Sequence, residues 1–169
     1  MFKKTLSVCA LLTCLPALAA DLRVQVEIPQ LDVAEYHRPY VALWIEQGNQ
    51  HKADLNVWYD IKMKNNEGEK WLKDMRQWWR RSGRSLEFPV DGVSAATRAV
   101  GTHSISFNSN SPALKSLEAG DYELLVEAAR EVGGREILRV PFSWPPQSTH
   151  TATAQGKTEL GMITLTTTP

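Results

Sequence analysis

The residues from Asp91 to Thr97 are the part of the chain best suited to chemistry: one carboxylate, a run of small residues and a closing hydroxyl. Small side chains would let the segment enter a narrow enzyme site, where Thr97 could accept a phosphoryl group. Phosphoryl transfer depends mainly on positioning and charge neutralisation, so a partner enzyme could supply the metal ion and the base. Asp91 and Ser94 would then serve for recognition, or would fix the loop through side-chain to backbone hydrogen bonds. The alternative is an ordinary surface turn, because Asp-Gly opens many turns.

Other residues of the sequence show no pattern typical of a catalytic or metal site. Four histidines lack metal-ligand spacing: His37, His51, His103 and His150. Three carboxylates fit a solvated helix face better than an acid/base pair: Glu67, Glu69 and Asp74. The chain also lacks a Gly-x-Ser-x-Gly motif and a phosphate-binding glycine loop. We therefore predict no catalytic residue, no metal site and no enzyme activity.

Residues 1–20 are typical of a cleaved secretory signal peptide: two lysines, an apolar run at 6–18 and a cleavage-type sequence, Ala17-Leu18-Ala19. The apolar run is too short to span a bilayer. A lipid-attachment box ending at Cys14 is the alternative. Both cysteines, Cys9 and Cys14, lie inside this segment, so the mature chain can form neither disulfides nor thiolate metal sites. We expect the mature protein in the periplasm.

The mature chain, residues 21–169, has the length of one ordinary domain. The whole sequence has 19 basic and 19 acidic residues. Two of the basic residues belong to the signal peptide, which leaves 17 basic against 19 acidic residues, or a net charge of about −2. A net charge of this sign does not indicate binding to nucleic acid or to an anionic membrane surface.

Alternation of apolar and polar residues predicts half-buried strands, and a segment that is apolar on both faces predicts an interior strand. These segments are 22–28, 39–46, 55–59, 103–107, 122–128, 138–144 and 160–165. The first three are expected to form a meander, with 47–54 as a hairpin-like connection. Gly133-Gly134 predicts a hairpin turn, Pro141 indicates an edge strand or a bulge, and 145–156 is expected to be a polar loop.

Residues 67–82 predict one amphipathic helix, which Gly83 ends. Its apolar residues recur at i, i+1, i+4, i+7 and i+8: Trp71, Leu72, Met75, Trp78 and Trp79. If covered, each tryptophan would bury on the order of 150–250 Å². We expect this stripe to pack against a sheet as core, and the alternative is that Trp78 or Trp79 offers a platform for a planar ring.

These elements predict a mainly β fold: an antiparallel immunoglobulin-like β-sandwich of seven to eight strands with one amphipathic helix inserted at about 67–82. Tyr122 supports this prediction, because immunoglobulin-like sandwiches place a tyrosine at a strand start, where its hydroxyl bonds back to the preceding loop. We expect residues 21–169 to form a single β-sandwich domain.

The segment Asp91–Thr97 resembles the acceptor motif of proteins that carry covalent FMN, written roughly as Asp, two variable residues, Ser or Thr, Gly, Ala, Thr. In such proteins a flavin transferase splits FAD and leaves FMN on the final threonine as a phosphoester. The resemblance implies FMN on Thr97, and Ala95 stands where the motif usually has glycine. It also implies transferase recognition by three residues: Asp91, Ser94 and Ala96. If Trp78 or Trp79 offers the platform considered above, that side chain would contact the flavin.

Four blocks of the chain resemble the predicted periplasmic family called domain of unknown function 2271 (DUF2271): 39–46, 70–80, 91–98 and 120–142. Members of that family resemble extracytosolic redox components found beside flavin transferases and membrane reductases of the PepSY type. Val132 stands where the resemblance implies a histidine before the double glycine.

The resemblance implies a periplasmic electron-transfer protein that carries FMN covalently on Thr97. An FAD:protein FMN transferase would attach the flavin, and a PepSY-type membrane reductase would exchange electrons with it. The alternative is a cofactor-free periplasmic binding or adaptor module that contacts a membrane protein through an edge strand or its tryptophan-bearing face. Neither function involves nucleic acid or a membrane-spanning segment of this chain.

Overall fold

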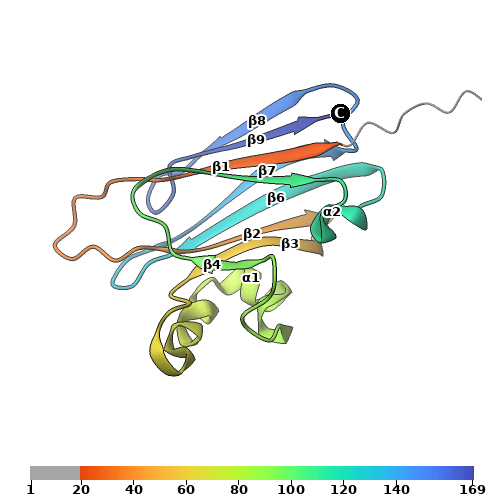
Figure 1. Cartoon of the computed structure of the whole chain (residues 1–169). Coiled ribbons are helices and arrows are strands. Elements are labelled where there is room, and N and C mark those ends of the chain that lie inside the picture. Colours follow the sequence, from red (N-terminus) through yellow and green to blue (C-terminus); the bar gives the residue numbers. More distant parts are fainter. Residues whose placement is uncertain (1–19) are drawn as a thin grey trace, which may run out of the picture.

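The computed structural model describes residues 20–169, so the predicted signal peptide lies outside the described residues except for Ala20. Nine strands in this part of the chain form two sheets that lie face to face (Figure 1). The elements in chain order are β1 (Asp21–Ile28), β2 (Tyr40–Gln47), β3 (Gln50–Tyr59), η1 (Lys64–Asp74), α1 (Arg76–Arg81), η2 (Gly83–Ser85), β4 (Ser94–Ala96), β5 (Gly101–Asn108), α2 (Pro112–Lys115), β6 (Gly120–Ala129), β7 (Arg135–Trp144), β8 (His150–Gln155) and β9 (Met162–Thr168).

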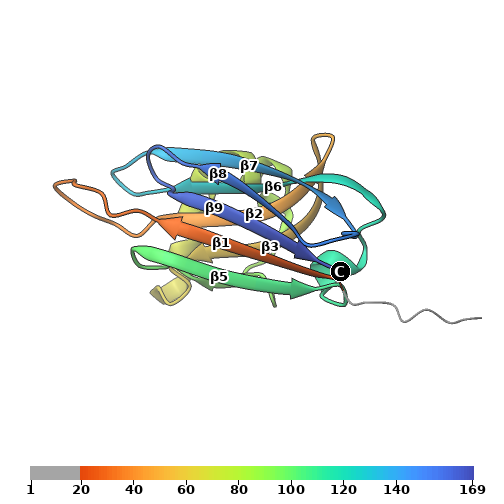
Figure 2. The ribbon, with the colours of Figure 1, turned by 90° about the horizontal axis from the view of Figure 1, so that it is seen from above.

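The two sheets have different sizes. One has four strands in the order β5-β1-β9-β8 and is seen from above in Figure 2. The other has five strands in the order β4-β3-β2-β6-β7. Pairing is antiparallel throughout except where β4 runs parallel to β3. The mainly β, sandwich-like architecture predicted from the alternating segments is therefore confirmed.

Three predictions about strand connections are wrong. The predicted meander does not exist, because β1 pairs with β5 and β9 in the other sheet. The connection between β2 and β3 is only Gly48-Asn49, whose positive φ values of 54° and 67° suit a tight hairpin, so most of the expected connection at 47–54 is strand. The expected loop at 145–156 contains β8, which pairs with β9. Threonine and alanine alternate in β8, and these residues differ too little in hydrophobicity for alternation to indicate a strand.

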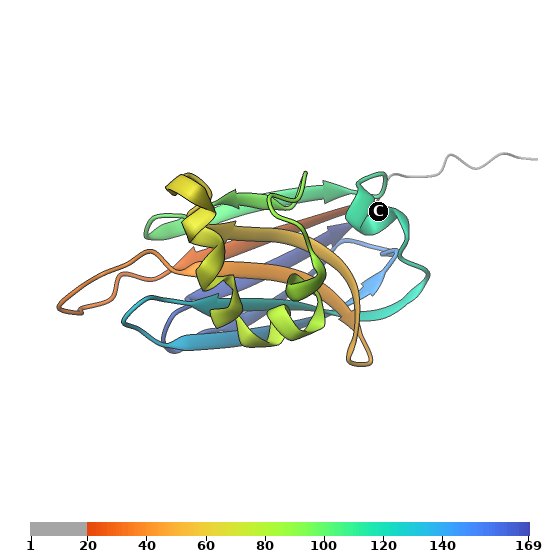
Figure 3. The same ribbon diagram turned by 90° about the horizontal axis from the view of Figure 1, so that it is seen from below.

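The five-stranded sheet is covered on both faces. Its inner face packs against the four-stranded sheet, and its outer face packs against η1 and α1, which Figure 3 shows lying across it. Strand β2 contributes Val41, Leu43 and Ile45 to the first core and Tyr40 and Trp44 to the second. The prediction of an interior strand covered from two sides is confirmed.

The predicted single helix at 67–82 is wrong. The chain forms a 3₁₀ segment, η1, then a break at Met75 with ψ of 73°, and then the six-residue helix α1. Leu72, Met75 and Trp78 are fully buried, whereas Trp71 is 46% exposed. Leu72 lies in η1, Met75 lies at the break, and Trp78 lies in α1. The segment therefore buries Leu72 and Trp78 but leaves Trp71 partly exposed.

Two local predictions about the later strands are confirmed. The Tyr122 hydroxyl donates a hydrogen bond to the Glu118 carbonyl oxygen at 2.8 Å, across the corner that leads into β6. Pro141 lies in β7, which is an edge strand of the five-stranded sheet. An edge position tolerates proline because the missing N–H would face solvent.

Candidate functional site

Thr97 directly follows β4 and is held at the end of the five-stranded sheet. Its backbone N–H donates to the Tyr59 carbonyl oxygen at 3.2 Å, and its hydroxyl donates to Asp60 Oδ1 at 3.1 Å. Tyr59 is the last residue of β3, so both contacts depend on the parallel pairing of β3 and β4. The threonine side chain is therefore fixed in place while staying partly exposed.

The predicted acceptor segment is only partly a loop. Gly92, at φ of +73°, makes the turn, and Ser94 begins the short strand β4. The Ser94 hydroxyl accepts a hydrogen bond from the Val90 N–H at 2.9 Å, which is the local fixing role expected for it. Ala95 faces the core between the sheets, while Asp91 and Ala96 are exposed. Since β4 is an edge strand, one side of its backbone is open to a partner.

A hollow of about 450 Å³ opens beside Thr97, and we call it the Thr97 hollow. It lies where β2 begins and where β3, β4 and β6 end, with η1 as a further wall. Its aromatic lining comes from three residues: Tyr36, Tyr40 and Trp71. Asp60 and Arg130 also line it. The volume lies within the range of roughly 300–1,000 Å³ typical of small-molecule and cofactor sites.

Arg130 is a buried cation in the wall of this hollow. Its side chain is 6% exposed, and its Nε and Nη2 donate to the Glu159 carboxylate at 2.8 and 3.2 Å. The remaining nitrogen, Nη1, is shielded from solvent and has no hydrogen-bond partner among residues 20–169. The same holds for the Tyr36 hydroxyl oxygen. Buried polar groups are normally satisfied, so these two open positions in one hollow need an explanation.

Both tyrosines of the hollow keep their protons at neutral pH. Burial raises the pKa of Tyr40 to about 12. Burial also raises the pKa of Tyr36, although the positive charges of Arg130 and Arg38 partly offset this effect. The Tyr40 hydroxyl donates to the Gly68 carbonyl oxygen at 3.1 Å. The Tyr36 hydroxyl is thus a neutral group that can donate a hydrogen bond inside the hollow.

The tryptophans predicted as flavin contacts lie elsewhere. Trp78 is fully buried against the outer face of the sheet, so it is a core residue and offers no surface for a ring. Trp79 is partly buried and packs beside it, with ring centroids 6.2 Å apart. Neither lines the Thr97 hollow, whereas the exposed Trp71 does. A continuous helix would have put all three on one stripe, so the sequence pattern alone could not single out Trp71.

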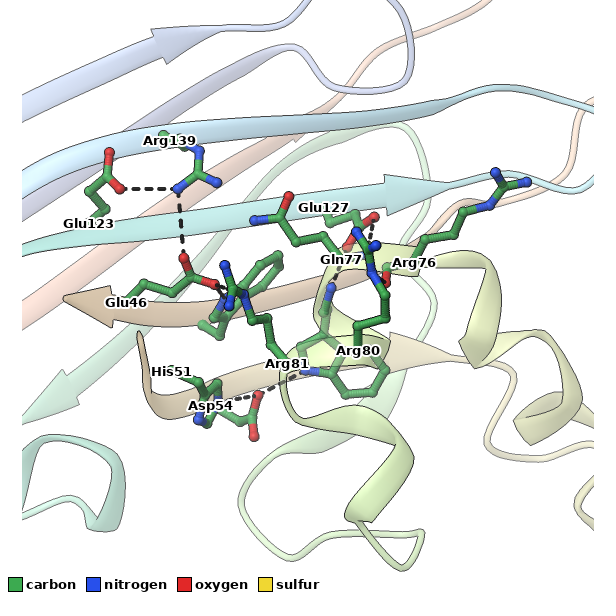
Figure 4. A network of polar contacts seen from close by, with 12 residues as sticks. Glu46, His51, Asp54, Arg76, Gln77, Arg80, Arg81, Glu123, Glu127 and Arg139 are labelled. Carbon is green, nitrogen blue, oxygen red and sulfur yellow. Dashed lines mark hydrogen bonds and ion pairs between the residues drawn. The ribbon is translucent and has the colours of Figure 1, made fainter. Parts of the chain in front are cut away.

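A second polar region lies between α1 and the sheet, and we call it the α1 network (Figure 4). Glu127 on β6 is fully buried and accepts hydrogen bonds from the backbone N–H groups of Gln77 and Trp78 at 3.1 and 2.8 Å. It also pairs with Arg135 at 2.6 Å. The helix has no side-chain cap of its own, so Glu127 satisfies its first N–H groups from a distant strand.

Asp54 ties the same helix to β3. It accepts a hydrogen bond from Trp78 Nε1 at 2.8 Å and one from the Ser82 hydroxyl, and His51 Nε2 lies 3.1 Å away. Burial by itself would raise the pKa of Asp54, but the nearby His51 ring and the hydrogen bond from Ser82 outweigh it and lower that pKa below its usual value. Because Asp54 lies between the serine and the histidine, these groups do not form a nucleophile and base pair.

Two features of functional relevance are absent from residues 20–169. No group of three His, Cys, Asp or Glu side chains is arranged to hold a metal ion. No helix in this part of the chain is long and apolar enough to cross a membrane.

Comparison with known proteins gives one match. The model of a family described as "Predicted periplasmic protein (DUF2271)" matches residues 21–162. Neither the search of curated proteins nor the search of solved structures found a match. The matched range includes Thr97, Asp60 and Arg130, and it therefore covers the walls of the Thr97 hollow.

Proposed function

This chain belongs to the DUF2271 family of predicted periplasmic proteins, and we propose that it is a periplasmic electron-transfer protein with FMN attached covalently to Thr97. One observation carries the proposal. The Thr97 hydroxyl lies at a hollow of about 450 Å³ that has aromatic walls and open hydrogen-bond donors. A tethered ring could therefore lie in the hollow while its phosphate stays on the threonine.

Attachment would be a phosphoryl transfer with FAD as the second reactant. The Thr97 oxygen bonds to the phosphorus of the FMN half, the bond between the two phosphates breaks, and AMP leaves. The hydroxyl proton passes to a base, and Asp60 is placed to receive it because it already accepts a hydrogen bond from this hydroxyl at 3.1 Å. An FAD:protein FMN transferase would supply the metal ion and bind FAD.

The exposed parts of the acceptor segment would meet the transferase. Asp91 and Ala96 are exposed, and the outer edge of β4 is unpaired, so an enzyme could bind the segment without unfolding the sheet. Ser94 would act indirectly, because its hydroxyl holds the turn that precedes β4. Ala95 faces inward, where an added methyl group relative to the usual glycine does not obstruct the exposed side.

The residues of the hollow suit a flavin ring. Trp71, at 46% exposure, offers an aromatic face for stacking, and Tyr36 and Arg130 offer donors. When bound, FMN would supply reversible electron storage, while the protein supplies orientation and local charge. A PepSY-type membrane reductase is the proposed electron-transfer partner.

The alternative is a cofactor-free periplasmic binding or adaptor module with an immunoglobulin-like fold. Exposed apolar side chains favour it: Met63, Trp71 and Val132 are 46%, 46% and 78% exposed. All three line the Thr97 hollow, so a partner protein could dock there instead of a ring.

The intact mass of the protein decides between these functions. Mature protein made with an active flavin transferase should gain the mass of one FMN less one water. Thr97→Ala should abolish the gain, Thr97→Ser should retain it, and Thr102→Ala should retain it as a matched change at an exposed threonine. An unmodified wild-type mass, with a second flavinylated protein labelled in the same host, would favour the adaptor function.

A further inference from the structure

Arg130 is held rigidly although one of its nitrogens has no partner. It follows the last residue of β6, and the Glu159 carboxylate accepts hydrogen bonds from its Nε and Nη2. Glu159 is only 4% exposed and accepts a further hydrogen bond from the Gly134 N–H at 2.7 Å. The guanidinium group therefore cannot swing out to solvent without leaving a buried carboxylate unpaired, which would be costly.

The hairpin after β6 is shaped around this ion pair. A Cβ atom on Gly133 would lie 2.5 Å from Arg130 Cζ, and one on Gly134 would lie 2.9 Å from Glu159 Oε1. Val132, which lines the hollow, has a φ of +52°, a conformation that β-branched residues rarely adopt. Backbone strain of this kind gathers at functional sites. The two glycines therefore leave room for the Arg130–Glu159 pair.

Tyr36 provides the second open group in the same wall. Its hydroxyl oxygen is buried and has no hydrogen-bond partner in residues 20–169. Tyr36 and Arg130 line the same hollow, and the positive charge of Arg130 partly offsets the effect of burial on the pKa of Tyr36. Leaving a buried donor unpaired destabilises the fold. A ligand that completes both hydrogen bonds in the hollow would offset this destabilisation.

We propose that Arg130 Nη1 and the Tyr36 hydroxyl form a donor pair that binds the acceptor edge of a planar ring in the Thr97 hollow. With the proposed function as its premise, the ring is isoalloxazine and the edge is its pyrimidine edge, which carries two carbonyl oxygens. Arg130 and Tyr36 are then binding residues for the ring, distinct from the residue that carries its phosphate.

Riboflavin tests this donor pair separately from attachment, because it has the ring but no phosphate. Full-length chain made without a transferase is titrated with riboflavin, and quenching of flavin fluorescence gives the dissociation constant. Arg130→Lys keeps a charge for Glu159 but removes the free Nη1, and Tyr36→Phe removes only the hydroxyl. We expect each to weaken binding roughly tenfold. Arg139→Lys, outside the Thr97 hollow, should leave the constant unchanged.

The outcomes separate this inference from the proposed function. Equal riboflavin binding by wild type, Tyr36→Phe and Arg130→Lys would overturn the donor pair, as would no binding by the wild type, even if FMN is found on Thr97. Weaker binding by both variants without any FMN on Thr97 would support the donor pair and overturn covalent attachment. Circular dichroism of each variant checks that the sheets are intact. If Arg130→Lys does not fold, riboflavin binding by Tyr36→Phe still decides whether the donor pair exists.

Discussion

The five-stranded sheet carries two clusters of buried polar groups that differ in what surrounds their unpaired atoms. In the α1 network, both oxygens of Glu127 accept hydrogen bonds. Two other atoms there lack a hydrogen bond, but each lies near a group of opposite charge: Glu46 Oε2 is 3.7 Å from Arg139, and His51 Nε2 is 3.1 Å from Asp54. At the Thr97 hollow, Arg130 Nη1 and the Tyr36 hydroxyl also lack a hydrogen-bond partner, and both residues line a cavity. Groups between two packed layers hold those layers together, whereas unpaired donors beside a hollow are suited to a ligand. Substitutions in the first cluster should therefore change stability, and those in the second should change binding.

Glu127→Ala should have the largest effect on stability among the polar substitutions. It leaves two helix N–H groups and Arg135 without their acceptor. Arg135 is 40% exposed and can be hydrated, so the loss comes mainly from the two unpaired helix N–H groups, at about 1–3 kcal/mol each. The free energy of unfolding, measured with urea, should fall by about the sum of these two losses. Glu123→Ala, on the same strand but 41% exposed, should cost less than about 1 kcal/mol. Similar losses for the two variants would contradict the structural role given to the α1 network.

Asp54→Asn should have an intermediate effect, and it depends on pH. The pKa of Asp54 in the folded protein lies below its ordinary value of 3.8, so the unfolded state binds more protons in acid. The stabilisation is full above about pH 4 and is lost as the pH falls through the folded pKa. The variant should lose about 1.5–3 kcal/mol at pH 7, the value of charge-assisted hydrogen bonds. Its unfolding free energy should fall less steeply in acid than that of the wild type, and parallel curves would show that Asp54 does not titrate in this way.

Trp71→Ala should change stability least, by less than about 0.5 kcal/mol, because the side chain is 46% exposed. It should nevertheless weaken riboflavin binding by roughly three- to tenfold through the loss of stacking. Trp78→Ala is the matched comparison within the same predicted stripe and should cost about 3–5 kcal/mol in unfolding free energy. If Trp71→Ala proved equally destabilising, the division between core and hollow would be wrong at this residue.

The sequence predicted the burial of side chains along β6 only in part. Alternation in β6 correctly placed Leu124 and Val126 on the inner face. The same alternation suggests that Glu127 faces solvent, yet it is fully buried because η1 and α1 cover that face. Burial of a charged residue on a predicted outer face depends on which distant segment packs there, and periodicity along one strand carries no such information.

The sequence by itself determined the period-two strands, the tight corner at Tyr122, the small-residue segment ending at Thr97 and the resemblance that led to the family. These follow from local sterics and from the burial of alternating apolar side chains, which act over a few residues. The immunoglobulin-like topology and covalent FMN stay predictions. Only the tertiary structure decided that Asp60, Trp71 and Arg130 meet beside Thr97. Four strand ends and a 3₁₀ segment must come together to form that hollow, and such long-range packing leaves no signal in the spacing of residues along the chain.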